Sequence, residues 1–276
     1  MQKKLLIIGK NSYIGSSFKS YVENGFLDIQ QLQVKMTGSK NNQWQSEELS
    51  QYDVILHAAA IVHQKETEDK RQLYIDVNKN LPVEVAKKAK AAGVKQFIFL
   101  STMAVYGEVE GAITKDTPLK PTTMYGKTKL AAERELAKLA DENFKVVILR
   151  PPMVYGENCP GNYTRLKKLA KVLPVFPDVE NKRSMVHVDT LSACIVKQIM
   201  KNSKQECTEE SQPVTILHPQ DKYPVKTTDM YVKLRRDMGK KTYTTKVFNG
   251  VIEVLKGRVG TVRKLFGSCY YDEIDK

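Results

Sequence analysis

The sequence of 276 residues lacks long hydrophobic runs, paired cysteines, internal repeats and low-complexity segments. No apolar run approaches the ~18–20 residues that a membrane-spanning helix needs, and the first run, residues 5–8, is too short for the core of a signal peptide. The four cysteines show no CxxC spacing, which argues against a metal site or a disulfide framework and fits a reducing cytoplasm. With 41% hydrophobic and 27% charged residues, the composition is typical of a globular protein rather than a disordered or fibrous one.

Positive charge is in excess, because 44 Lys and Arg residues oppose 31 Asp and Glu residues and give a net charge of +13. Three kinds of partner fit such an excess: nucleic acid, an anionic membrane surface, or a phosphorylated small molecule. Nucleic acid is disfavoured, since the basic residues do not gather in a recognised binding module with stacking aromatic side chains. Residues 226–264 alone hold 11 Lys and Arg against 3 Asp and Glu. With its interleaved apolar residues, this segment predicts either a solvated helix packed on the rest of the protein or peripheral contact with an anionic membrane.

Short β-rich runs alternate with helix-length stretches through the first half of the chain. Buried parallel strands are predicted at 5–8, 54–56, 97–100 and 146–149, with helices at 81–92 and 125–141. This alternation indicates an α/β fold with a doubly wound parallel sheet. We expect a cofactor-binding region at 1–151 and 184–205, and a substrate-binding region at 152–183 and 206–276, which begins in a proline-rich stretch and ends in the basic segment.

The first strand runs directly into a turn of small residues. Gly9, Ser12 and Gly15 are spaced so that the backbone can approach a pyrophosphate closely. Tyr13 and Ile14 then open a helix, whose first N–H groups and positive dipole end favour an anion. Because the motif follows a strand and begins a helix, it predicts a dinucleotide-binding turn.

Dinucleotide folds usually place an acid at the end of the second strand to bind the adenosine ribose. That strand is predicted at 32–36, and no acid occurs between Asp28 and Glu47. Ser39, with Lys35 and Lys40 nearby, would tolerate a ribose 2′-phosphate. The cofactor is therefore expected to be NAD or NADP, and whether the lysines read a phosphate or are solvated surface charges stays open.

Tyr125 and Lys129 lie four residues apart, on one face of a predicted helix. A nearby ammonium group and a bound nicotinamide cation would lower the pKa of the phenol and make it a general acid or base near neutral pH. The same spacing recurs at Tyr163 and Lys167, so spacing alone decides nothing. Only the first pair follows a strand that ends at Thr102, and catalytic groups are expected at the carboxyl ends of such strands.

Further segments stand in the same order as in one known family: 57–60, Asn78, 105–107, 150–156 and 183–189. With the turn and the Tyr-Lys pair, they make the chain resemble an extended short-chain dehydrogenase/reductase of the NAD-dependent epimerase/dehydratase family, which acts on nucleotide sugars. The resemblance spans most of the chain. It implies a Rossmann domain with a small C-terminal substrate-binding cap, a UDP-linked sugar as substrate, and a homodimer.

The resemblance also implies roles for individual residues. Thr102 would hydrogen-bond the reacting sugar oxygen, Tyr125 would move its proton, and Lys129 would bind the nicotinamide ribose. The further cofactor contacts that it implies are Ala58, Ala59 and Ala60 along the cofactor path, Asn78 at the following helix, and Pro152 beside the nicotinamide. The implied substrate contacts are Met103 and Met153 near the sugar, Asn162 and Arg183 at the diphosphate, and Val175 and Phe176 at the uracil.

Departures from the family pattern narrow the reaction. The 4,6-dehydratases carry an Asp-Glu pair after the catalytic Thr, where this chain has Met103 and Ala104, and the GDP-fucose synthase type needs a Cys that is missing here. Two reactions at carbon 4 remain: reduction of a 4-keto-6-deoxy sugar and 4-epimerisation. Met153 replaces an Asn found in many epimerases, and the missing ribose acid favours the reductase.

Two further expectations complete the interpretation. The four histidines show no metal-ligand spacing, so no metal site is expected. A non-catalytic dinucleotide-binding regulator is the remote alternative, disfavoured because such proteins typically lose the Tyr or the Lys that this chain retains.

Overall fold

The computed structural model describes residues 2–25, 32–62, 64, 66–201, 212–272 and 274–275. The chain forms two compact units. The first comprises Met1–Glu108, Pro118–Pro151 and Val188–Pro219, and the second comprises Val109–Thr117, Pro152–His187 and Gln220–Lys276. The bounds of the two units differ from the predicted regions at three segments. In each case the segment belongs to the unit that contains the strand with which it pairs, and sequence patterns do not reveal such pairing. Residues 111–113 pair with 269–271, 185–187 pair with 153–155, and 214–217 pair with 146–149.

The first unit is built on a six-stranded, fully parallel sheet with the order β10-β6-β4-β3-β1-β2. Its strands are β1 (Lys3–Ile8), β2 (Leu32–Thr37), β3 (Val54–His57), β4 (Gln96–Leu100), β6 (Lys145–Leu149) and β10 (Val214–Leu217). The chain adds β2 on one side of β1 and then returns to add β3 on the other side. This reversal places a crevice at the carboxyl ends of β1 and β3, where open α/β sheets bind their ligands.

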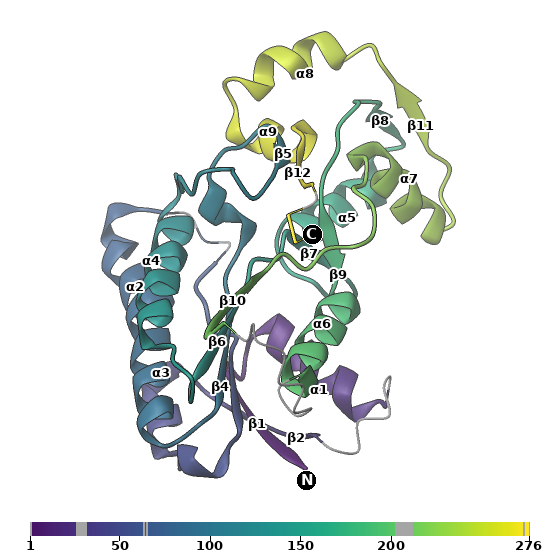
Figure 1. The fold of residues 1–276 in the computed structure, drawn as a ribbon. Helices are drawn as coiled ribbons and strands as arrows, with labels where there is room; N and C mark the ends of the chain where they lie inside the picture. The colour runs from purple at the N-terminus through teal and green to yellow at the C-terminus, as the bar shows by residue number, and fades with distance from the viewer. Residues whose placement is uncertain are drawn as a thin grey trace. The chain divides into compact units, whose positions relative to one another are not determined.

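Helices cover both faces of the sheet, so the predicted doubly wound α/β fold is confirmed (Figure 1). One face carries α1 (Tyr13–Glu23) and α6 (Val188–Lys201), and the other carries α2 (Arg71–Ile75), α3 (Leu81–Ala91) and α4 (Met124–Leu139). The central strands β3, β4 and β6 are buried on both sides and are mostly apolar for that reason, whereas the edge strand β2 carries the exposed Gln33 and Lys35. Alternate strand residues such as Ile8, Phe97 and Ile148 pack against α3 and α4, together with Trp44 and Phe144.

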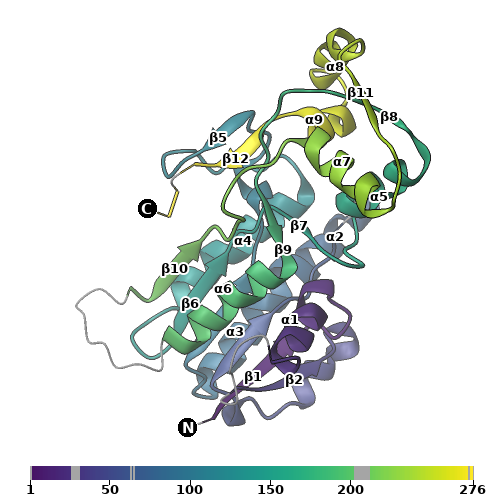
Figure 2. The ribbon, with the colours of Figure 1, turned by 90° about the vertical axis from the view of Figure 1, so that its right-hand side faces the viewer.

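The second unit contains three two-stranded parallel sheets and four helices in the described residues (Figure 2). The strand pairs are β5 (Gly111–Ile113) with β12 (Cys269–Tyr271), β7 (Met153–Tyr155) with β9 (Met185–His187), and β8 (Val175–Pro177) with β11 (Tyr243–Thr245). The helices are α5 (Asn162–Val172), α7 (Thr227–Asp237), α8 (Asn249–Lys256) and α9 (Gly260–Phe266). They enclose a small core in which the rings of Phe176 and Tyr231 stack at 3.8 Å.

The later part of the basic segment, with its interleaved apolar residues, forms two helices, α8 and α9. Gly257 and Gly260 lie at the break, and glycine is among the poorest helix formers. Within the described part of the chain, no helix combines the length and the apolar character needed to cross a membrane.

Candidate active site

The turn after β1 is shaped by close packing against the end of β3. Gly9 has a φ of +128°, and a Cβ atom there would lie 2.8 Å from the main-chain nitrogen of Ala59. The N–H groups of Gly9 and Lys10 each donate to the carbonyl of Thr37 at 3.0 Å, which ties the turn to the end of β2. Only glycine allows this approach, so the sequence motif marks a real constraint on the backbone.

The first helix begins at this turn. Ser12 caps α1, and its hydroxyl accepts the N–H of Gly15 at 3.2 Å. Tyr13 and Ile14 occupy the first turn, where main-chain N–H groups have no intrahelical acceptor. A Cβ on Gly15 would lie 3.1 Å from Ile7, which explains the small residue at the contact of helix and strand. The turn therefore presents helix N–H groups at the carboxyl end of β1, as a pyrophosphate site requires.

The small residues after β3 pack beside this turn. The N–H groups of Ala58 and Ala59 both donate to the carbonyl of Ile8 at 2.9 Å, while Ala60 is exposed. Asn78 is buried in a π-helical turn (Asp76–Asn80) between α2 and α3. Its carboxamide accepts the N–H of Ile61 at 2.8 Å and donates to the carbonyl of the same residue at 3.0 Å. Asn78 thus fixes the segment that follows the alanines, and π-turns of this kind are frequent at functional sites.

The end of β2 carries an acid that sequence reasoning missed. Glu47 accepts hydrogen bonds from Lys35 at 2.8 Å and from the hydroxyl of Tyr52 at 3.2 Å, and it also bonds the side chain of Thr37. Burial acts to raise the pKa of Glu47, but these hydrogen bonds hold it below its usual value. The 3₁₀ helix at Lys40–Ser46 brings the chain back to the end of β2. Trp44, which is fully buried in this helix, was the one residue of the segment that could have indicated its return.

The structure bears on whether Lys35 and Lys40 are free to bind a ribose 2′-phosphate. Lys35 is paired with Glu47, so its charge is already met within the protein. Ser39 precedes the 3₁₀ helix without a side-chain capping bond, and Lys40 begins that helix.

Thr102 and Tyr125 come together at the carboxyl end of β4. The hydroxyl of Thr102 accepts the N–H of Ala104 at 3.1 Å, and its side chain hydrogen-bonds that of Tyr125. Burial raises the pKa of Tyr125 to about 12, although the bond to Thr102 opposes this shift. The pKa expected to be lowered by an ammonium group together with a bound nicotinamide cation is instead raised by burial in the protein without cofactor.

Lys129 lies one turn further along α4 and is almost fully buried. Its Nζ donates to the carbonyl of Leu100 at 2.7 Å and lies 4.4 Å from the ring centroid of Phe99. Burial lowers the pKa of Lys129 to about 7, while Glu133 acts in the opposite direction. The chain thus brings a protonated phenol, a hydroxyl and a readily titrating amine to one strand end.

A buried ion pair that sequence reasoning did not identify joins α4 to the residue that follows β6. Glu133 accepts two hydrogen bonds from Arg150, at 2.7 and 3.2 Å, and a further one from Ser101. Arg150 also donates to the hydroxyl of Tyr106 at 2.9 Å, which in turn contacts Nε2 of His218 at 2.8 Å. In the sequence, the only local indication of this hydrogen-bond network is that Glu133 follows Lys129 by four residues and so lies on the same face of the helix.

Glu66 was also missed. Its two carboxylate oxygens accept the N–H groups of Met124 and Tyr125, at 2.8 and 3.0 Å. These are the first two residues of α4, so Glu66 caps the helix that carries the candidate catalytic pair. No sequence pattern links a loop residue to a helix 58 positions later.

The remaining predicted cofactor and substrate residues are divided between the units. Met103 begins a 3₁₀ turn (Met103–Tyr106) in the first unit, and its N–H donates to the carbonyl of Pro151 at 2.9 Å. Pro152, Met153, Asn162, Val175, Phe176 and Arg183 belong to the second unit. The roles of these residues stay predictions.

Within the second unit, these residues have different surroundings. Asn162 is exposed at the start of α5, and Val175 is exposed on β8. Phe176 is buried in the core, so its side chain is a packing element. Arg183 donates to the carbonyl of Gly267 at 2.8 Å, and burial lowers the pKa of its guanidinium.

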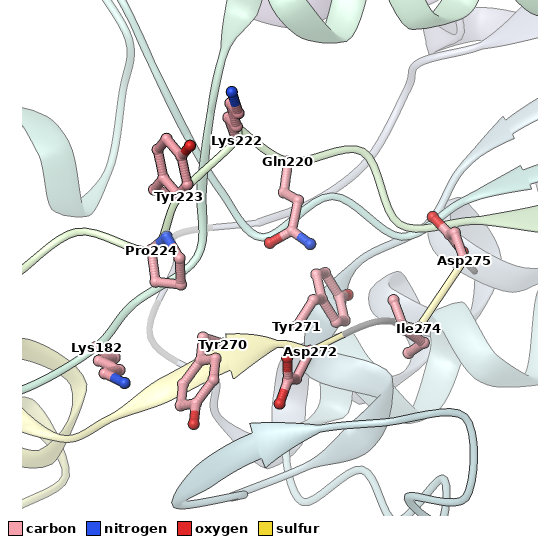
Figure 3. A pocket seen from close by; sticks show the side chains of 10 residues that line it. All are labelled: Lys182, Gln220, Lys222, Tyr223, Pro224, Tyr270, Tyr271, Asp272, Ile274 and Asp275. Atoms are coloured by element: carbon pink, nitrogen blue, oxygen red, sulfur yellow. The ribbon is translucent and has the colours of Figure 1, made fainter.

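The second unit also contains an open cavity of about 720 Å³ (Figure 3). None of the predicted site residues lines it. Its lining residues are Lys182, Gln220, Lys222, Tyr223, Pro224, Tyr270, Tyr271, Asp272, Ile274 and Asp275. Among the described residues, no group of three or more His, Cys, Asp or Glu side chains is arranged to hold a metal ion.

Curated relatives match parts of this chain. A UDP-glucose 4-epimerase of Vibrio cholerae is 36% identical over 152 residues, which are 52% of this chain and 46% of that protein. An N-acetyl-alpha-D-glucosaminyl-diphospho-ditrans,octacis-undecaprenol 4-epimerase of Escherichia coli O157:H7 is 29% identical over 217 residues, 73% of this chain and 64% of that protein. The matched regions thus span about half to two thirds of these relatives.

Solved structures share the fold. A dTDP-4-dehydrorhamnose reductase from Clostridium acetobutylicum has a TM-score of 0.69 at 20% identity, covering 88% of this chain and 82% of its own. A UDP-glucuronic acid 4-epimerase from Bacillus cereus, in complex with NAD, has a TM-score of 0.69 at 21% identity, covering 88% and 85%. The sequence profile of the NAD dependent epimerase/dehydratase family matches residues 5–210, and the chain belongs to this family.

Proposed function

We propose that this protein transfers a hydride at carbon 4 of a UDP-linked sugar, and that it acts as a reductase of a 4-keto-6-deoxy sugar. The observation that carries the proposal is the hydrogen bond between the side chains of Tyr125 and Thr102 at the carboxyl end of β4, with the phenol protonated at neutral pH. A phenol that stays protonated at neutral pH is a proton donor, and reduction of a ketone needs a donor at the carbonyl oxygen.

The residues at the ends of β1, β2 and β3 fit NAD or NADP. The packing of Gly9 on Ala59 leaves the turn without side-chain bulk, and α1 offers its N-terminal N–H groups to the pyrophosphate. When bound, the nicotinamide supplies or accepts the hydride. Lys129 would hold its ribose, and Ser39 would lie near the adenosine ribose at the end of β2.

In the proposed reduction, Thr102 donates a hydrogen bond to the sugar oxygen and Tyr125 delivers the proton as hydride adds to carbon 4. Lys129, whose pKa is about 7, would be partly charged at neutral pH and would favour the phenolate that remains until a proton from solvent restores the phenol. In the second unit, Arg183 and Asn162 would bind the substrate diphosphate, since a guanidinium matches phosphate oxygens in geometry and charge. Met103 and Met153 would contact the sugar, and the segment of Val175 and Phe176 would contact the uracil.

A 4-epimerase is the second candidate, favoured by the names of the Vibrio cholerae and Escherichia coli relatives. It would use the same residues twice, first to oxidise carbon 4 and then to return the hydride to the other face. The two reactions differ in net redox change, so one experiment separates them.

The protein is incubated with a UDP-4-keto-6-deoxy-hexose plus NADPH or NADH, and separately with UDP-glucose and UDP-N-acetylglucosamine without added cofactor. The reductase predicts oxidation of the reduced cofactor together with a 4-hydroxy product. Interconversion of the unmodified UDP-sugars without external reductant would instead identify an epimerase. Light scattering of the same preparation measures whether the chain forms the predicted homodimer.

A further inference from the structure

One surface of the second unit combines exposed apolar and basic side chains. Val247, Phe248, Val251 and Val254 are exposed by 83%, 51%, 60% and 59%. Lys246 before α8, Arg258 after it and Lys264 on the following helix α9 are also exposed. We call these seven residues the α8 face. Single exposed apolar residues are ordinary, but four within eight positions form a patch that calls for an explanation.

The geometry of α8 shows why these side chains stay exposed. Val251 and Val254 are three residues apart on α8 and share one side of the helix, while Val247 and Phe248 lie in the turn that precedes it. Ile252 points the other way into the core of the unit and anchors the helix there. The side chain of Asn249 donates to the carbonyl of Asp178 at 2.9 Å and fixes the start of α8. Both views place α8 at the outer edge of its unit (Figures 1 and 2).

The segment that carries the patch is mostly basic, and Asp178, an acid of another segment that lies near Lys246, is paired with Lys226 at 2.7 Å. Residues 240–264 hold seven Lys and Arg and a single acid, Glu253. This acid is paired with Lys256 at 2.7 Å, so it does not neutralise the exposed Lys246, Arg258 and Lys264. A second copy of the chain docked symmetrically on this face would place like charges against each other, which disfavours a dimer contact here.

We infer that the α8 face docks the protein on an anionic lipid surface. A short helix with an apolar side and flanking basic residues lies in the plane of a bilayer interface, where the apolar side chains enter the boundary of the acyl chains. The basic side chains are attracted to anionic headgroups at the same depth. The face therefore provides both contributions to reversible peripheral binding, and the surface it requires is anionic rather than zwitterionic.

The test is sedimentation of the full chain with vesicles of equimolar phosphatidylglycerol and phosphatidylethanolamine, and with vesicles of phosphatidylcholine alone. Binding is expected to the first vesicles only and to weaken as salt is raised. The triple variant K246E/R258E/K264E should lower the partition coefficient on the order of a hundredfold, from the attraction of about 1 kcal/mol per basic residue. The double variant V251S/V254S should lower it by about tenfold, because less apolar surface enters the interface.

Matched controls are K87E/K95E/K197E, which removes the same charge from exposed positions of the first unit, and L73S/V172S, which removes exposed apolar groups elsewhere. Both should bind vesicles nearly as well as the unaltered protein. Absence of binding to anionic vesicles would overturn the inference, as would equal losses in the control variants. A change of oligomeric mass in V251S/V254S would assign the face to protein association instead. The assay involves no cofactor or sugar, so its outcome is independent of the proposed reaction.

Discussion

Glu66 accepts a hydrogen bond of 3.0 Å from the main-chain N–H of Tyr125 and, with its other oxygen, one of 2.8 Å from Met124. A loop carboxylate therefore caps the helix on which the candidate acid and its neighbouring lysine stand. The negative charge also lies at the positive end of the helix dipole, where it stabilises α4. This contact positions Tyr125 without touching the reacting atoms.

Replacing Glu66 by Ala should lower the free energy of unfolding by about 1 kcal/mol, as expected for loss of a helix cap. The free energy of unfolding of Glu66→Gln should lie between those of the unaltered protein and Glu66→Ala, because its amide retains a single acceptor oxygen. Urea denaturation measures both. Glu68→Ala is the matched control, since Glu68 is exposed and pairs with the nearby Arg71 at 3.1 Å, and it should change stability by less than about 0.5 kcal/mol. Equal losses in the two alanine variants would contradict the capping role.

Tyr125→Phe should lower turnover of a 4-keto UDP-sugar by about 10²–10⁴-fold, the usual contribution of a positioned general acid. Loss of one hydroxyl leaves the packing of the ring intact, so the thermal midpoint should change little. Steady-state oxidation of NADPH or NADH gives the rate. Tyr163→Phe removes the hydroxyl of the other tyrosine that has a lysine four residues later, and it should retain most activity. A Tyr125→Phe protein with unaltered turnover would refute the assignment.

Lys129 predicts a dependence of stability on pH. Its pKa is about 7 in the folded protein and about 10.5 when unfolded, so between these values the unfolded chain binds more protons. Stability therefore rises from pH 7 toward pH 9.5 through this residue, by at most about 1.4 kcal/mol per unit. Tyr125 contributes only above pH 10, where its raised pKa makes stability fall with pH.

The measurement is urea unfolding at pH 7 to 9.5, followed by the fluorescence of Trp44, the only tryptophan, which is buried. In Lys129→Met the rise with pH should be reduced relative to the unaltered protein. The exposed Lys87 serves as control, because Lys87→Met leaves the buried amine in place and should preserve the slope. Parallel pH curves for the unaltered protein and Lys129→Met would show that the amine is not titrating in this range.

The Glu133–Arg150 pair predicts a large effect on stability. Both side chains of the pair are buried. Glu133→Gln removes the negative charge and should lower the free energy of unfolding by about 3–5 kcal/mol, because Arg150 is left without its counter-ion. Glu135→Gln, two positions away on the same helix, affects only a partly exposed pair with Lys138 and should cost less than about 1 kcal/mol. Thermal unfolding of the three proteins compares them directly, and similar midpoints would contradict this role for the pair.

Local patterns predicted most of the first unit, since apolar runs and helical spacing report directly on burial. The Gly9–Gly15 turn and the Tyr125–Lys129 pair lie where the sequence placed them, because each motif depends on neighbours within a few residues. Glu66, Glu47 and Arg150 act through partners far away in the chain or across a strand, and no local pattern encodes such pairings. The bounds of the second unit shifted for the same reason, since its strand pairs join distant segments.

Glu47 predicts how the protein discriminates between NAD and NADP. Its carboxylate pairs with Lys35 and lies beside Thr37, at the strand end where the adenosine ribose is expected. In Glu47→Gln, Lys35 loses its partner and a negative charge that repels phosphate is removed. The affinity for NADPH relative to NADH should therefore increase several-fold, the effect of about one added contact between Lys35 and the 2′-phosphate. Fluorescence titration with each cofactor measures the ratio. Glu48→Gln removes an exposed neighbouring acid that accepts a hydrogen bond from Ser50, and it should leave the ratio unchanged. If the ratio changes equally in both variants, the effect is one of overall charge, whereas a change confined to Glu47→Gln places the discrimination at the end of β2.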